Sequence, residues 1–230
     1  MTHCIILKRR TRTRRKRAET SREIARRDRA ERLTSNRMMQ IPYGYPSGLP
    51  EMKFVDTDFS SAEITTTGVI SCVNAVQLGT SVNTRVGVDY LMRSMEIQGV
   101  LRAKSAGAGD TVALALVYDR QPNAALPSDW QTIWDRDHSE TLMRNHSNRR
   151  RFKVLWKGRH AIAPVGDTGQ RVIIDFYRPL KHPVSCNAGN AGTIADINAG
   201  ALYFMYIGEQ ATGTTATEFD GQVRVRYTDK

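Results

Sequence analysis

The sequence predicts an all-β protein: a single eight-stranded antiparallel jelly roll, a double-sheet sandwich with a basic, partly helical N-terminal arm. Three observations lead to this prediction. From residue 51 onward, short segments rich in Val, Ile, Thr and Tyr alternate with turn residues. Helical patterns are almost absent from that part of the chain. Basic residues, in contrast, are concentrated before residue 38.

The predicted arm is residues 1–37. Eight of the ten residues from Lys8 to Arg17 are basic. Residues 1–37 hold 14 Lys or Arg against four acidic residues, net +10, whereas the rest of the chain is net +1. Such dense like charge predicts that residues 1–17 are disordered in isolation. The pairs Glu23–Arg27 and Asp28–Arg32, at i,i+4 spacing, predict a marginal helix over residues 18–36.

The charge of the arm predicts a polyanionic partner, most often nucleic acid, bound by sequence-independent neutralisation of phosphates. A solvated charge run and a mitochondrial transit peptide are the weaker alternatives. The short basic runs around Lys8 and Lys16 also have the composition of a nuclear-localisation signal, which would be read by nuclear import receptors. The predicted nucleic-acid contacts of the arm are Lys8, Arg9, Arg10, Arg12, Arg14, Arg15, Lys16, Arg17, Arg22, Arg26, Arg27 and Arg29.

Residues 38–50 are predicted to be a tether, because residues 41–50 (IPYGYPSGLP) contain three prolines and two glycines. The folded domain is therefore expected at 51–230. Its predicted strands, in chain order, are Lys53–Phe59, Thr65–Asn74, Ser94–Lys104, Thr111–Asp119, Arg151–Arg159, Arg171–Tyr177, Ala201–Ile207 and Gln222–Tyr227.

Two kinds of strand are expected. In alternating strands one face is apolar: Met95, Ile97 and Leu101 form one such face. Between residues 151 and 159, the apolar face is predicted to hold Phe152, Val154 and Trp156, with Leu155 on the polar face. The segments Thr111–Asp119, Arg171–Tyr177 and Ala201–Ile207 are predicted to be mostly apolar strands.

The connections support a sandwich. Ser60–Ser61 and Gly107–Asp110 are predicted turns, and the long connections 120–150 and 179–200 are expected to cross between two sheets. A capping box at Ser128–Gln131 predicts a short helical turn through Trp134. Trp130 and Trp134 are expected as core anchors under this loop. An immunoglobulin-like sandwich fits less well because the Cys…Trp…Cys arrangement is missing.

A second basic segment follows the 120–150 connection. Its cations are interpreted either as the polar outer face of a half-buried strand or as a second stripe of phosphate contacts, and both readings stay open. The residues are Arg149, Arg150, Arg151, Lys153, Lys157 and Arg159.

No catalytic, metal or cofactor site is expected. The cluster Asp135–Glu140 (DRDHSE) is interpreted as a solvated loop rather than an acid–base site. His182 and Cys186 are four residues apart in what is predicted to be a proline-rich loop, a weak pattern for a metal. The three cysteines, at 4, 72 and 186, lack the spacing of a disulfide framework. No membrane span or signal peptide is apparent, and an intracellular site of synthesis is expected.

Four segments carry a resemblance to a known family. They are Val76–Gly87 (VQLGTSVNTRVG), Ile97–Arg102 (IQGVLR), Leu116–Asn123 (LVYDRQPN) and Gly200–Gly208 (GALYFMYIG). In this order they resemble the coat proteins of circular, Rep-encoding single-stranded DNA viruses, the geminivirus-like branch above all. The layout is also similar to the coat proteins of satellite necrosis viruses. One departure is that the N-terminal region lacks the Cys/His cluster that geminivirus coat proteins tend to carry.

The resemblance implies a virion shell of sixty identical subunits, with the arms pointing inward around single-stranded nucleic acid, DNA rather than RNA. Sixty arms at net +10 would offset roughly 600 phosphates. It also implies the host nucleus as the place of assembly, and no membrane partner. A cellular RNA-binding protein, such as a ribosomal component with a basic tail, is the alternative from another class. A jelly-roll enzyme with a targeting arm is the third.

Overall fold

The computed structural model describes residues 51–103, 109–163, 171–211 and 216–230, so the predicted arm and tether lie outside it. The described part contains strands and two short 3-10 helices, η1 (Trp130–Thr132) and η2 (Ile194–Asp196). Its strands are β1 (Lys53–Ile64), β2 (Val69–Cys72), β3 (Asp89–Ala103), β4 (Asp110–Asp119), β5 (Phe152–Ile162), β6 (Arg171–Cys186), β7 (Ile197–Ala199), β8 (Ala201–Ile207) and β9 (Thr217–Asp229).

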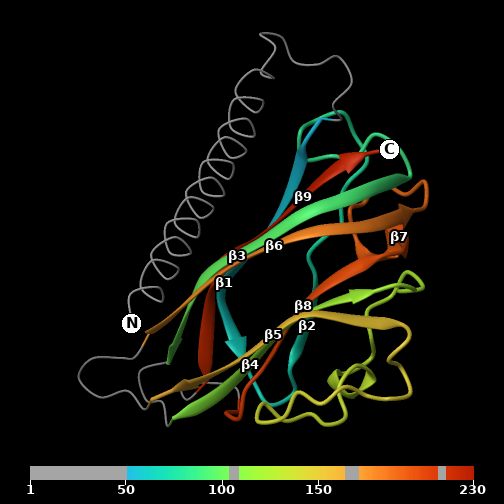
Figure 1. Cartoon of the computed structure of the whole chain (residues 1–230). Helices are drawn as coiled ribbons and strands as arrows, with labels where there is room; N and C mark the ends of the chain where they lie inside the picture. The colour runs from blue at the N-terminus through green and yellow to red at the C-terminus, as the bar shows by residue number, and fades with distance from the viewer. Residues whose placement is uncertain (1–50, 104–108, 164–170, 212–215) are drawn as a thin grey trace, which may run out of the picture. The chain divides into compact units, whose positions relative to one another are not determined.

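The strands form two antiparallel sheets, with the orders β1-β9-β3-β6-β7 and β2-β8-β4-β5 (Figure 1). If the three-residue β7 is left out, the other eight strands, numbered in chain order, pair first with last, second with seventh, third with sixth and fourth with fifth. This is the pairing of a long hairpin rolled into two sheets, a jelly roll. The predicted fold class is confirmed.

The core lies between the two sheets. Ile97 of β3 and Val223 of β9 are directly paired and fully buried. From the facing sheet, Phe204 of β8 packs edge-on against Phe59 at a ring-centroid distance of 5.3 Å, and against Phe219 at 5.4 Å. The sandwich is therefore closed by aromatic contacts between sheets, a packing that contributes beyond the burial of area alone.

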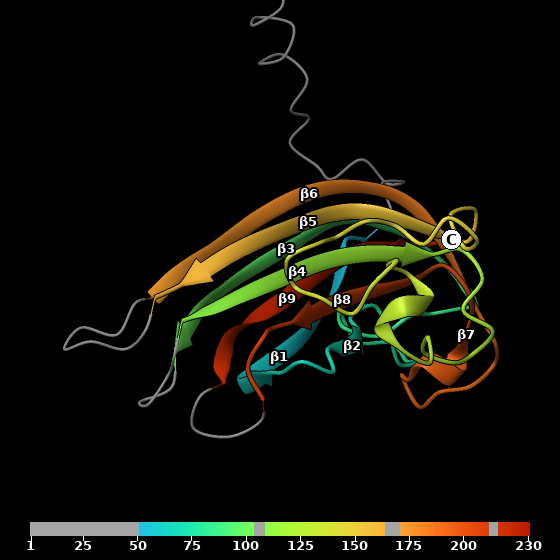
Figure 2. The same ribbon diagram turned by 90° about the horizontal axis from the view of Figure 1, so that it is seen from below.

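Strands β4 and β8 are buried on both faces because the connection between β4 and β5 covers the outer side of their sheet (Figure 2). Trp130 and Trp134, on this connection, are 2% and 0% exposed, and their rings stack at 6.0 Å. The Trp130 ring lies over Gly68, where an added Cβ would come within 3.1 Å of it. The predicted core role of both tryptophans is confirmed, and so are the mostly apolar strands β4 and β8. The same prediction is wrong for Arg171–Tyr177, because this part of β6 is covered on one face only and leaves Ile173 78% and Tyr177 60% exposed.

Several strand boundaries differ from the prediction, although β4 and β8 agree within a residue. The predicted break at Ser60–Ser61 is wrong: β1 continues through it as a β-bulge, with Ser61 at φ 47°. Strand β2 is shorter than predicted because residues 65–68 form a turn, while β3 and β9 each begin five residues earlier. Most of the predicted turn at 107–110 lies outside the described residues.

The prediction that residues 179–200 form a connection is wrong, because β6 continues through Pro179 and Pro183 to Cys186. Proline is tolerated there because β6 is an edge strand along most of its length, its partner β7 pairing only with Ser185 and Cys186. His182 therefore lies on a strand and not in a loop.

Two further predictions need correction. Leu155 is buried, not on the polar face of β5, because a register shift opposite Leu116 and Val117 makes it an extra residue in the strand. The helical turn exists as η1, but the side chain of Asp129, and not that of Ser128, caps it by accepting from the amide of Thr132 at 2.7 Å.

Candidate nucleic-acid interface

The predicted contacts between Lys8 and Arg29 lie outside the described residues, so the geometry of an interface is built from the body. Of the six predicted body cations, Arg149, Arg150 and Arg151 lie in the turn before β5, and Lys153, Lys157 and Arg159 lie on β5. Arg151 is half-buried and the other five are exposed. The structure engages them in different ways.

Arg151 is held by the protein itself. Its guanidinium donates to both carboxylate oxygens of Asp119, at 2.9 and 2.8 Å, and the Asp119 side chain is fully buried. Asp119 also accepts from the hydroxyl of Tyr203 at 3.1 Å. The same pair raises the pKa of Arg151, chiefly through the hydrogen bonds to Asp119. Arg151 thus joins the end of β4 to the start of β5.

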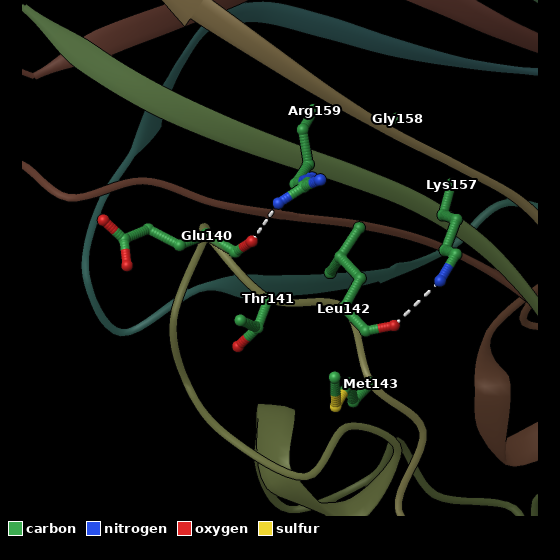
Figure 3. Close-up of a pocket in the computed structure, with 7 residues that line it drawn as sticks. All are labelled: Glu140, Thr141, Leu142, Met143, Lys157, Gly158 and Arg159. Carbon is green, nitrogen blue, oxygen red and sulfur yellow. Dashed lines mark hydrogen bonds between the residues drawn. The ribbon is translucent and has the colours of Figure 1, made fainter.

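Lys157 and Arg159 hold the β4–β5 connection against β5. Lys157 donates to the carbonyl of Leu142 at 2.9 Å, and Arg159 donates to the carbonyl of Glu140 (Figure 3). Met143 and these four residues line a shallow pocket of about 410 Å³. A neutral carbonyl group accepts one hydrogen bond from each cation but does not cancel its charge. Both side chains therefore hold the loop and still present a positive charge at the surface.

Lys153 belongs to a different group, at the seam where the edge strand β5 faces the edge strand β6. The strands are joined there by side chains: Trp156 stacks on Phe176 at 4.9 Å, and Arg178 donates to the carbonyl of Leu155. Lys153 Nζ lies 3.5 Å from His182 Nε2. The ring of His182 is stacked on Tyr118 at 4.5 Å, and this position is fixed by the bond from the Tyr118 hydroxyl to the Pro183 carbonyl.

We refer to Arg120, Lys153, Arg178 and His182 as the seam cluster. The pKa of His182 is below its ordinary value, first because the ring is partly buried and then because the charges of Lys153, Arg178 and Arg120 oppose its protonation. Four basic groups converge here from the ends of β4 and β5 and the middle of β6. Such an arrangement favours an anion, since a phosphate would relieve the repulsion among them.

Sequence reasoning identified Lys153 of this cluster but missed Arg120, Arg178 and His182. A signal did exist, because Arg178 and His182 are four residues apart and therefore share one face of a strand. It could be read only once residues 178–182 were known to be a strand.

The outer face of the five-stranded sheet has a different character, although it also carries many charges. Arg224 forms a two-point ion pair with Asp56 at 2.7 Å, Arg226 pairs with Glu96 at 2.8 Å, and Arg102 contacts Asp220 at 2.7 Å. Cations and carboxylates alternate across neighbouring strands, so this face neutralises itself. The seam cluster differs from this face in consisting of basic groups alone.

The described residues contain no group of three His, Cys, Asp or Glu side chains close enough to hold a metal ion. In the segment Asp135–Glu140, five of the six residues are exposed and Ser139 is buried, its hydroxyl donating to Glu209 at 3.0 Å. This agrees with the expectation of a solvated loop. None of the described segments forms a helix long and apolar enough to span a membrane.

Comparisons with known proteins point to one family. A family model described as "Geminivirus coat protein/nuclear export factor BR1 family" matches residues 6–230. The capsid proteins of two isolates, Spain-1 and Spain-2, of Tomato yellow leaf curl Sardinia virus are each 26% identical over 179 residues. Each alignment covers 74% of this chain, and the chain spans 66% of the length of these relatives.

Two solved structures are weakly similar to the chain. A structure of Desmodium yellow mottle tymovirus has a TM-score of 0.35 and 10% identity, covering 83% of this chain and 95% of that one. A structure of infectious bursal disease virus, strain Gx, has a TM-score of 0.32 and 10% identity, covering 78% of this chain and 32% of that one.

Proposed function

The chain belongs to the geminivirus coat protein/nuclear export factor BR1 family, a family of viral structural proteins, and we propose that it is a capsid subunit that packages single-stranded DNA. Sixty copies close into a small icosahedral shell. Residues 1–37 form the internal nucleic-acid-binding arm, residues 38–50 the tether, and residues 51–230 the shell domain. The packaged molecule is a circular single strand, held by charge and not by sequence.

The observation that carries this proposal is the separation of charge between arm and body. Residues 1–37 hold net +10 and the remaining chain net +1. A nearly neutral body allows copies to pack side by side without strong mutual repulsion, while the arm provides the attraction to phosphates. A single type of chain can therefore both form the shell and bind the nucleic acid inside it.

The seam cluster extends the proposal to the body. Sixty arms balance roughly 600 phosphates, and a longer genome needs further cations. Lys153 and Arg178, with Arg120 beside them, supply three more charges per subunit in one place. They are proposed as secondary phosphate contacts, which the nucleic acid meets after it has bound to the arm.

Electron microscopy of the purified full chain, mixed with circular single-stranded DNA, tests the proposal. The expected result is closed particles of uniform size whose contents resist added nuclease. Protein that stays monomeric or dimeric at every ionic strength, with DNA supplied, would contradict it. Extraction of the contents and digestion with DNA- and RNA-specific nucleases then identifies the packaged strand.

The basic runs of the arm are also proposed as a nuclear address, used before assembly. Lys8, Arg9 and Arg10 form one run and residues 14–17 (RRKR) the other. A fluorescent protein fused to residues 1–37 should accumulate in nuclei, and replacing both runs with glutamine should abolish the accumulation. Equal distribution of the two fusions would contradict this role.

A further inference from the structure

The loop between β2 and β3 exposes an apolar surface at one end of the sandwich. Leu78 is 40% exposed, Val82 47%, Val86 57% and Val88 48%. These four side chains are within eleven residues, whereas the other large exposed hydrophobic side chains of the described residues are spread over the body. We call Leu78, Val82, Val86 and Val88 the loop patch.

The backbone beneath the patch is held from within the loop. Arg85 donates its amide to the carbonyl of Gln77 at 2.9 Å, and its carbonyl accepts from Gly79 at 2.9 Å. Thr84 closes the tip with its amide and its hydroxyl, which both donate to the carbonyl of Ser81 at 3.1 and 2.9 Å. The polar groups of these residues are therefore paired in the isolated chain.

The loop is also fastened to the rest of the domain by a buried arginine. Arg85 is 0% exposed, and its guanidinium donates to the carbonyls of Val76, Gly87, Asn187 and Gly189. Two of these acceptors belong to the loop itself and two to the connection after β6. A buried charge with four carbonyl partners resists local opening, because releasing it would leave the acceptors unsatisfied.

A second attachment joins the loop to β1 and β9. The ammonium group of Lys53, 3% exposed, donates to the Thr84 carbonyl at 3.0 Å and pairs with Asp229 at 2.9 Å. Asp229 also accepts from the amide of Val86 at 3.2 Å, and the amide of Phe54 donates to the carbonyl of Val82 at 3.2 Å. The patch is thus a fixed surface, and 40% to 57% of each of its apolar side chains remains exposed in one subunit.

Nucleic acid is a poor occupant for this surface. The two cations that hold the loop, Lys53 and Arg85, are both buried and engaged, so neither points outward to a phosphate. Of the exposed residues along the loop, Gln77, Thr80, Ser81 and Asn83 are neutral and polar, and Asp89, which follows Val88, is acidic. An apolar centre with a polar, partly acidic rim is typical of a protein–protein interface and unsuited to phosphates.

We propose that the loop patch docks on a second copy of this chain and is one of the contacts from which the shell is built. The inference rests on the proposed function, because a capsid subunit must present fixed surfaces to its own copies. The near-neutral body supports it, since two copies can approach at this surface without strong charge repulsion. If the loop of one copy meets a different surface of the next, the contact closes around a threefold or fivefold axis of such a shell; if two loops meet, it closes around a twofold axis.

The test uses the full chain with Val82→Asp and, separately, Leu78→Gln. Both remove apolar surface at the rigid tip without touching the Arg85 or Lys53 hydrogen bonds. The matched control is Ile173→Asp, an equally drastic change at an aliphatic side chain that is 78% exposed on β6. Sedimentation velocity without nucleic acid measures self-association, and electron microscopy with single-stranded DNA counts particles.

We expect Val82→Asp to reduce the particle yield at least tenfold and to weaken self-association, Leu78→Gln to do so less, and Ile173→Asp to match the parent. Unchanged assembly in Val82→Asp, equal loss in Val82→Asp and Ile173→Asp, or a melting temperature of the unassembled Val82→Asp subunit several degrees lower would each overturn the inference. The last result would mean that the chain covers its own patch. If the parent protein forms only small oligomers and Val82→Asp dissociates them, the loop contact is supported and the proposed sixty-subunit shell is contradicted. A parent protein that is monomeric under all conditions would contradict both the loop contact and the shell.

Discussion

Arg151 and Asp119 form a two-point ion pair, with N–O distances of 2.9 and 2.8 Å, that joins the start of β5 to the end of β4. The carboxylate is completely buried, whereas the arginine side chain is 31% exposed. One member of the predicted phosphate stripe thus has a structural partner 32 residues earlier in the chain. The guanidinium group of Arg151 is therefore already engaged within the domain and is not free to bind a phosphate.

Replacing Arg151 with alanine should therefore destabilise the domain. The Asp119 carboxylate would remain buried without its partner, and breaking a buried pair costs about 3 kcal/mol, the lower end of the usual range because Arg151 is partly exposed. Urea unfolding followed by fluorescence measures the change. The control is Arg150→Ala, next to it and exposed, which should alter the free energy of unfolding by about 0.5 kcal/mol or less. Equal stabilities of the two variants would contradict the structural role.

Replacing Lys153 with glutamine should weaken nucleic-acid binding without weakening the fold. Removing one phosphate contact reduces the slope of log affinity against log salt by about 1. Binding of a fluorescent single-stranded oligonucleotide, titrated at several salt concentrations, gives this slope. Lys230→Gln removes an equal charge from an exposed position at the end of the chain and serves as the control. If both variants lower the slope equally, the effect is one of net charge and the seam cluster is not a site.

Stability should depend on pH through His182. Burial, followed by Lys153, Arg178 and Arg120, lowers the pKa of this histidine in the folded protein. The unfolded chain therefore takes up the proton at a higher pH, near the ordinary value of about 6.5. The contribution of the neutral ring to stability is complete above that pH, declines as the pH falls below it, and stops declining below the folded-state pKa.

Melting temperatures between pH 8 and pH 5 test this expectation. His182→Gln should flatten the decline below about pH 6.5, although His160, whose pKa is also lowered by burial, will leave part of it. Inorganic phosphate should raise the melting temperature most at the acid end, because an anion in the cluster favours the protonated ring. The same slope in His182→Gln and the parent would contradict the role assigned to this residue.

Removing residues 1–37 should leave a folded body that still forms empty shells, while the nucleic-acid content collapses. The reason is that the arm holds net +10 and the rest of the chain net +1. The ratio of absorbance at 260 and 280 nm in purified particles measures the content. A second variant with the same arm residues in shuffled order should package normally, since phosphate neutralisation depends on charge and not on order. Unchanged packaging in the truncated protein would show that the body holds the genome.

Much of the architecture was predictable because it depends on local patterns. The apolar runs at 111–119 and 201–207 predicted two strands that are buried throughout, and the paired tryptophans were recognisable as core anchors under a loop. The run at 171–177 was wrongly grouped with them, because its exposed face depends on what covers the sheet. The extent of β6 was not predictable in the same way. Proline argues against a strand unless the strand lies at an edge, and edge position is a property of the sheet and not of the segment.

The candidate site shows the same division. Arg149–Arg159 was recognisable as a basic segment, but its residues look alike in the sequence and the structure separates them. Arg151 is paired with a buried carboxylate, Lys157 and Arg159 fasten a loop, and Lys153 joins Arg178 and His182 across the seam. Which cation meets which partner depends on contacts between residues 15 to 32 positions apart, which no local pattern encodes.

The sequence by itself determined that this protein has a polycationic arm and a nearly neutral β domain, because charge and side-chain alternation are counted along the chain. Only the tertiary structure decided that β5 and β6 of the predicted jelly roll meet at their edges. It also decided that Arg85 is buried while four aliphatic side chains of the same loop are exposed. The physical reason is the same in each case: pairing between strands, burial and the neighbours of a charge are set by residues distant in sequence, and they exist only after the chain has folded.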